Sequence, residues 1–283
     1  VHVCVLAAAM RLSDLQRGKD GFSEEEQQRQ QLNLQLSGVS DTDELPTVAE
    51  LELVRQLKAD FSHEFEERAA TCRDFPPLFG DIALTRVLRG CNRDLKMSAE
   101  WFTRFLESVQ RFNIDAMYTA LAKTLSDNPD TPYGSASLLP HSDDIRRYVH
   151  EIYHYPKATR TGDLINYFAV VDIDMEGIQR DGMMQKFIEY HQAATLMRII
   201  VLDQQSRIQG RVVKTIWLAD LAEASLRTFM RQHMDAEVQK QYQDSAGMFN
   251  ETVAAEVMRK MYVLNAPWWA VRMWKVFLRV LPE

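Results

Sequence analysis

The sequence predicts an α/β protein in which an all-helical N-terminal unit is followed by a mostly parallel sheet with flanking helices. Residues 46–125 carry only helical patterns, whereas short runs rich in β-branched and aromatic residues occur at 165–171, 212–218 and 261–264. Helical stretches separate these three runs. Strands joined through helices form right-handed crossovers, so we expect the three strands to be parallel.

The composition is that of a globular protein, with 46% hydrophobic and 26% charged residues among 283. The net charge of -7 and the lack of a basic tract argue against nucleic acid as a partner. Cys4, Cys72 and Cys91 have no paired spacing, which favours a reducing, cytoplasmic compartment. Because no apolar run reaches the length of a membrane span, any membrane association is expected to be peripheral.

Residues 1–45 are polar and rich in Gln and Glu, and we expect a flexible prefix there. Residues 1–9 are apolar enough to end a signal peptide, an alternative that the absent basic segment disfavours. Since the chain starts at Val1, we also expect that its natural N-terminus is missing.

The expected helical unit covers residues 46–125. Thr47 and Glu50 form a capping box, and an apolar stripe then runs to about Ala70. Further helices are predicted at 81–89, 95–112 and 114–125.

A linker is predicted at 126–144, where Pro, Gly and Ser accumulate, and the second domain at 145–283. The helices expected in that domain are 145–155, 178–204, 225–241 and 252–260.

One catalytic motif occurs in the chain, the HExxH of His150, Glu151 and His154, which can hold Zn²⁺ and activate a water. Pro156 ends that helix at once, and the third ligand stays open among Asp172, Asp174 and Glu176. Nucleophile-elbow and phosphate-loop motifs are absent from the sequence. We therefore expect a protein that is no enzyme, with no catalytic residues, metal or cofactor, and keep a zinc hydrolase as the less favoured alternative.

The last stretch of the chain combines aromatic side chains with cations at helical spacing after Pro267. This composition is typical of a helix at a membrane–water boundary, the alternative being a core helix with a solvated basic face. The residues concerned are Trp268, Trp269, Arg272, Trp274, Lys275, Phe277 and Arg279.

Three stretches resemble the CRAL-TRIO lipid-transfer family, of the phosphatidylinositol-transfer type. They are DIALTRVLRGCNRDLKMSAEWF from Asp81, VVKTIWLADLAEASL from Val212, and RKMYVLNAPWWAVRMWKVFL from Arg259. The third, with its Asn-Ala-Pro turn, is the most specific. The resemblance covers about residues 47–283, and it implies that the domain is incomplete at its C-terminus.

The resemblance implies an apolar cavity for one lipid, closed by the aromatic gate helix. It places Glu256 and Thr215 at the headgroup, although the residue pattern alone predicts Glu256 on the surface of a short helix. It places Trp217, Tyr262 and Leu264 at the cavity, with Trp217 where the family pattern has a second hydroxyl. Cys91 and Asn92 stand at basic positions of the family.

The expected function is to bind one lipid, a phospholipid such as phosphatidylinositol or another hydrophobic ligand, and to exchange it during transient contact with a membrane. A lipid-sensing scaffold that does not transfer its ligand is the alternative. The sequence indicates no particular protein partner.

Overall fold

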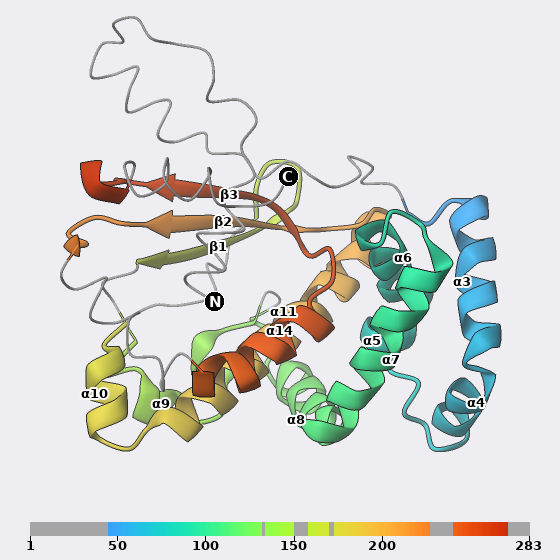
Figure 1. Ribbon diagram of the computed structural model, residues 1–283, viewed down its shortest axis with the longest axis horizontal. Helices are drawn as coiled ribbons and strands as arrows, with labels where there is room; N and C mark the ends of the chain where they lie inside the picture. The colour runs from blue at the N-terminus through green and yellow to red at the C-terminus, as the bar shows by residue number, and fades with distance from the viewer. Residues whose placement is uncertain (1–44, 132–133, 150–157, 170–172, 227–239, 271–283) are drawn as a thin grey trace, which may run out of the picture.

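A computed structural model describes residues 45–131, 134–149, 158–169, 173–226 and 240–270, and its fold is α/β (Figure 1). Strands β1 (Leu164–Ala169), β2 (Thr215–Asp220) and β3 (Met258–Leu264) form a sheet in the order β1-β2-β3. Both pairings are parallel, as predicted. The strands begin on the side of the N-terminal helices and point away from them (Figure 1).

The register of the sheet assigns its side chains to two faces. Trp217 pairs with Met261 and Ala219 with Val263, so these four side chains share the first face. In the part of the chain that the structure describes, the helices that lie along the sheet are on one side of it (Figure 1). Met261 and Val263 are buried against that layer, whereas the next residues along the strand, such as Tyr262, are only half-buried.

The described elements from residue 48 to 127 are all helices. They are α3 (Val48–Asp60), α4 (Ser62–Ala70), α5 (Pro76–Phe79), α6 (Asp81–Gly90), α7 (Leu95–Arg111) and α8 (Ile114–Asp127). The predicted capping box at Thr47 and Glu50 is formed, but the helix it starts ends at Asp60, and a new helix, α4, begins after Phe61. Stacked rings of Phe65 and Phe102, 5.6 Å apart, pack this unit together.

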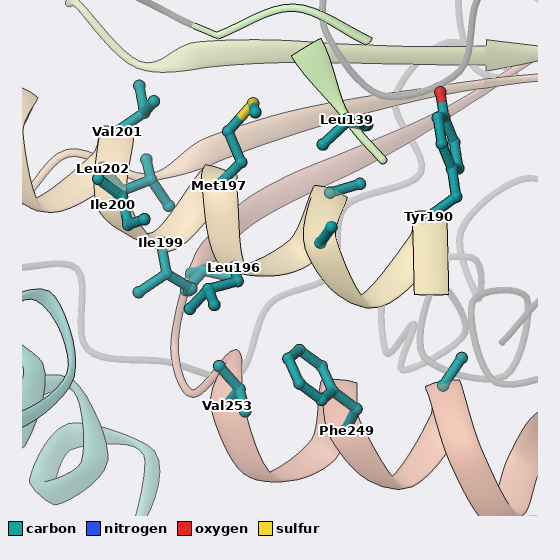
Figure 2. Packing of buried hydrophobic residues seen from close by; sticks show 14 of the residues in the cluster. Leu139, Tyr190, Leu196, Met197, Ile199, Ile200, Val201, Leu202, Phe249 and Val253 are labelled. Carbon is teal, nitrogen blue, oxygen red and sulfur yellow. The ribbon is translucent and has the colours of Figure 1, made fainter. Parts of the chain in front are cut away.

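Helix α11 (Met184–Gln209) packs against both the helical unit and the sheet. It is buried on nearly all sides, as expected for a helix at the centre of a domain. Figure 2 shows its apolar side chains beside Phe249 and Val253, which belong to α14 (Met248–Val253). The helices and the sheet therefore share one continuous core.

The segment predicted as a linker also packs on this core. It contains the short helices η1 (Ala136–Leu138) and α9 (Ser142–Ile145), and Leu139 between them is buried. Gly134 has a φ of 74°, and a Cβ there would lie 2.8 Å from the sulfur of Met197 on α11. This close approach explains the glycine.

Three predicted helices differ from the structure. The helix expected at 178–204 is two helices, α10 (Met175–Arg180) and α11 (Met184–Gln209). The helix expected at 145–155 was wrong beyond Ile145 in the described residues: α9 ends at Ile145, and Val149 forms an isolated β-bridge with Ile173. Residues 150–157 lie outside the described part. The helix expected at 252–260 was wrong after Val253: residues 254–257 form a turn, and residues 258–260 belong to β3. Arg259 and Lys260 hide the strand pattern, and pairing with β2 makes these residues extended.

Candidate functional site

Three charged residues stand at the amino edge of the sheet, each just before a strand. Asp163 and Lys214 directly precede β1 and β2, and Glu256 lies two residues before β3. Because the strands are parallel, their first residues meet at one edge. All three side chains are at most 5% exposed, so this edge holds a buried charge cluster.

Asp163 joins the starts of all three strands. Its Oδ1 accepts hydrogen bonds from Arg211 and from the backbone N–H of Lys214, each at 3.1 Å. Its Oδ2 accepts from Arg259 Nε of β3 at 2.5 Å. A single carboxylate thus ties the three strands together by charge-assisted bonds.

Glu256 pairs with Lys214, with 3.0 Å between Oε2 and Nζ. Burial raises the pKa of Glu256, an effect that Lys214 and Arg86 oppose. In the described part of the chain, Oε1 of Glu256 is buried without a hydrogen-bond partner. That oxygen is able to accept a hydrogen bond from a donor brought by a ligand.

Arg86 of α6 attaches the helical unit to this cluster. It donates to Val213 O at 2.7 Å, to Ser206 Oγ at 3.3 Å and to Glu256 O at 3.4 Å. Burial lowers its pKa to about 10, and the charges of Asp203 and Glu256 oppose that shift. Arg86 remains a cation at neutral pH.

A second buried carboxylate, Glu50 of α3, holds α3 to the end of α6. It pairs with Arg89 at 2.8 Å and with Arg93 at 2.9 Å. Hydrogen bonds from Arg89, stronger here than the opposing effect of burial, lower the pKa of Glu50 to about 2.

The structure brings the two predicted headgroup residues close together, Thr215 as the first residue of β2 and Glu256 in the turn before β3. Thr215 donates through Oγ1 to the carbonyl of Val257, the residue after Glu256, at 3.0 Å. Its hydroxyl also accepts from Trp217 Nε1 at 3.0 Å, and the residue is fully buried. The pattern-based prediction of Glu256 on a helix surface was wrong: it lies in a turn with a φ of 53°, and its side chain is 2% exposed.

The three predicted cavity residues do not share one face of the sheet. Trp217 lies on the helix-covered face, with Arg198 of α11 4.8 Å from its ring centroid and Phe168 beside it. Tyr262 and Leu264 pair with Leu218 and Asp220 on the opposite face. A cavity on either face is therefore lined by only part of the predicted set.

The face that carries Tyr262 and Leu264, the second face of the sheet, is largely apolar. Apart from Ala169, which is buried, its aromatic and aliphatic side chains are half-buried. They are Ile165, Tyr167, Ile216, Leu218, Tyr262 and Leu264.

The carboxyl edge of the sheet is organised around Asp220, the last residue of β2. Its Oδ1 accepts from Asn265 Nδ2 at 2.9 Å and from Ala222 N at 2.8 Å, and its Oδ2 accepts from Tyr167 O–H at 3.0 Å. Burial alone would raise the pKa of Asp220, but these hydrogen bonds outweigh it and lower the pKa. Neutral donors from β1 and the Asn-Ala-Pro turn thus meet on this carboxylate.

The residues after the Asn-Ala-Pro turn begin as a helix, as Pro267 predicts. Trp269 is buried and donates from Nε1 to Ala224 O at 3.2 Å, whereas Trp268 is 71% exposed. The other predicted gate residues, Arg272, Trp274, Lys275, Phe277 and Arg279, lie outside the described part.

The alternative zinc ligands His150, Glu151 and His154 also lie outside the described residues. Within the described ranges, no group of His, Cys, Asp and Glu is arranged to hold a metal ion. None of the helices described is long and apolar enough to cross a membrane.

The buried partners of Glu256 were missed by sequence reasoning because isolated charges normally indicate solvent exposure. One signal was available: Lys214 lies inside the predicted strand 212–218, where a buried charge requires a partner. No protein-family model matches this chain, and no curated protein sequence is significantly similar to it.

Proposed function

We propose that this protein binds one lipid in an apolar cavity over the second face of the sheet and exchanges it at membranes. The observation that carries the proposal is the contrast between the two faces. α11 packs on the first face, whereas the second presents half-buried apolar side chains such as Leu218 and Tyr262. Parallel sheets ordinarily bury both faces, so an apolar second face is suited to serve as the floor of a ligand site.

The physical basis is the transfer of acyl chains out of water. Keeping one CH₂ group out of water contributes roughly 0.8 kcal/mol to the free energy of transfer. A carrier must therefore offer a site as apolar as the bilayer interior and open it only at a bilayer. The resemblance of the Asn-Ala-Pro stretch to CRAL-TRIO proteins supports a gate that begins at Pro267. In this proposal Trp268, Trp269 and the aromatic and basic residues up to Arg279 form the gate.

For the headgroup, we propose a hydroxyl-bearing lipid such as phosphatidylinositol. The buried Oε1 of Glu256 supports this choice, because an inositol hydroxyl is a donor for it. Thr215 contributes by binding the carbonyl of Val257, the residue after Glu256, since its own hydroxyl already bonds within the protein.

Native mass spectrometry of the full chain after incubation with phosphatidylinositol-containing vesicles tests the proposal. We expect one bound lipid, and we expect Leu218→Trp, which fills the second face, to lose it. Val48→Trp, at an exposed position of α3, is the control and keeps the lipid. A wild-type spectrum free of lipid contradicts the proposal.

The same experiment separates the alternatives. A bound lipid without exchange between vesicles indicates a lipid-sensing scaffold that does not transfer. Stoichiometric zinc that is lost in His150→Ala indicates a zinc hydrolase. The gate is tested by the triple variant Trp268→Ala, Trp269→Ala and Trp274→Ala. We expect this variant to exchange lipid more slowly than the wild type, and an unchanged rate would exclude the gate assignment.

A further inference from the structure

Among the paired strand residues that the structure describes, the second face of the sheet carries one charged side chain near each end. Lys260 pairs with Ile216 near the amino end, and Asp220 pairs with Leu264 at the carboxyl end. Apolar side chains such as Leu218 lie between them. Because alternate strand residues share a face, the two charges stand on one apolar surface, roughly 13 Å apart along the strands.

The two charges differ in their partners. Asp220 accepts hydrogen bonds from Tyr167 and Asn265. Lys260 is half-buried, and the described part of the chain provides its ammonium with neither a hydrogen bond nor an ion pair. A cation that is partly withdrawn from water on an apolar face is available to an anion.

The buried carboxylates of the amino edge already have cations of their own. Asp163 is bonded to Arg211, and Glu256 is bonded to Lys214. Both acids are therefore neutralised within the edge. The amino end of the second face thus presents a positive charge that no carboxylate of this edge cancels.

An apolar surface with a cation at one end is complementary to an amphiphile whose polar group is an anion. Hydrocarbon chains gain free energy by leaving water for apolar side chains, and a phosphate forms charge-assisted hydrogen bonds with an ammonium. At the other end of the face, the carboxylate of Asp220 repels an anion. The charges therefore favour one direction of the bound molecule, with its anion at the amino end.

We infer that Lys260 binds the phosphate of an anionic phospholipid whose acyl chains lie along the second face towards Leu264. This inference rests on the proposed function and names the class of lipid, an anionic phospholipid in preference to a neutral lipid. Glu256, the proposed acceptor for a headgroup hydroxyl, lies at the same end of the sheet, four residues before Lys260. Phosphatidylinositol carries both a phosphate and hydroxyl groups, so each residue has a partner on it.

Native mass spectrometry tests the inference on the full chain after incubation with vesicles that contain phosphatidylinositol and diacylglycerol in equal amounts. Diacylglycerol has the acyl chains and a hydroxyl group but no phosphate. We expect the wild type to prefer phosphatidylinositol. Lys260→Met retains an apolar side chain without the charge and should reduce this preference about tenfold, the effect of one hydrogen bond to a charged group, while it still carries diacylglycerol.

Two variants are controls. Lys260→Arg keeps the cation and should keep the preference. Lys123→Met removes a lysine at an exposed position of α8 and should behave like the wild type. Circular dichroism checks that each variant folds, and Lys260→Gln replaces Lys260→Met if the methionine variant does not fold.

An unchanged preference in Lys260→Met overturns the inference and leaves Lys260 as a charge that protects an edge strand. An equal loss in Lys123→Met overturns it as well. A soluble phosphate is tested with inositol monophosphate in place of vesicles, where we expect no adduct. A stoichiometric adduct that Lys260→Met loses assigns the lysine to a soluble phosphate and also overturns the inference.

The failures of the two proposals are distinguishable. A wild-type chain that carries neither lipid contradicts the proposed function and the role of Lys260 with it. A wild-type chain that carries both lipids without preference contradicts the role of Lys260 alone.

Discussion

The two edges of the sheet bind their strands with different chemistry. At the amino edge, Asp163 and Glu256 are buried and paired with cations. At the carboxyl edge, Asp220 is partly buried and receives its bonds from neutral donors. Removing one partner of a buried ion pair costs about 3–5 kcal/mol, whereas a typical neutral hydrogen bond contributes about 0.5–1.5 kcal/mol.

Because of this difference, we expect the two edges to need different amounts of free energy to open. Opening the amino edge costs more free energy, because it breaks ion pairs of buried carboxylates, and Arg86 also bonds the helical unit to this edge. The carboxyl edge can rearrange at small cost, because its donors and its carboxylate bond equally well to water. A movement of the segment after the Asn-Ala-Pro turn, which the proposed function requires, therefore belongs at the carboxyl edge.

The largest effect is expected for Asp163→Asn at the amino edge. The variant leaves the charges of Arg211 and Arg259 without their carboxylate and should lower the free energy of unfolding by about 3–5 kcal/mol. Urea denaturation measures it. Asp143→Asn, in an exposed ion pair, is the control and should unfold like the wild type. A loss below about 1 kcal/mol for Asp163→Asn would mean that the ion pairs of the amino edge are no stronger than exposed ones.

The pair of Glu256 and Lys214 should show strong coupling. We expect Glu256→Leu to destabilise by about 3 kcal/mol, because it leaves the Lys214 ammonium buried without its partner. The double variant with Lys214→Met should be more stable than Glu256→Leu alone, which a double-mutant cycle measures by urea denaturation. Additive effects would mean that the pair contributes nothing specific to this edge.

Acid should weaken the attachment of α3 through Glu50. Its pKa in the folded state is about 2, below the ordinary value of 4.5, so the unfolded chain binds the proton more readily. The stabilisation is present above pH 4.5 and is lost as the pH falls towards 2. Denaturation midpoints between pH 6 and pH 2 should therefore decline less in Glu50→Gln than in the wild type. Parallel curves would contradict the shifted pKa.

The smallest effect on stability is expected for Asp220→Asn at the carboxyl edge. An amide retains one acceptor oxygen, so the loss should be about 1 kcal/mol. Hydrogen exchange should nevertheless become faster for the amides of Leu221 and Ala222, while Lys214 at the amino edge stays protected. Faster exchange at both edges would show that the two do not open independently.

Local sequence patterns were sufficient to predict the class of the fold and the position of most elements. Thr47 and Glu50 start α3 through a local capping box, and Pro267 marks the start of the last described helix. All three strands were predicted, with β1 displaced by one residue at its start and β2 and β3 by three. These signals are contained within a few neighbouring residues, and local interactions are sufficient to produce them.

Which charges are buried, and which residues share a face of the sheet, depends on contacts between distant parts of the chain. Glu256 lies 42 residues from Lys214 and 170 from Arg86, and these contacts enclose it. Trp217 and Tyr262 lie on opposite faces because the register of β2 and β3 separates them, although both belong to predicted strands. Burial and register depend on partners that are distant in the chain, and no local pattern encodes them.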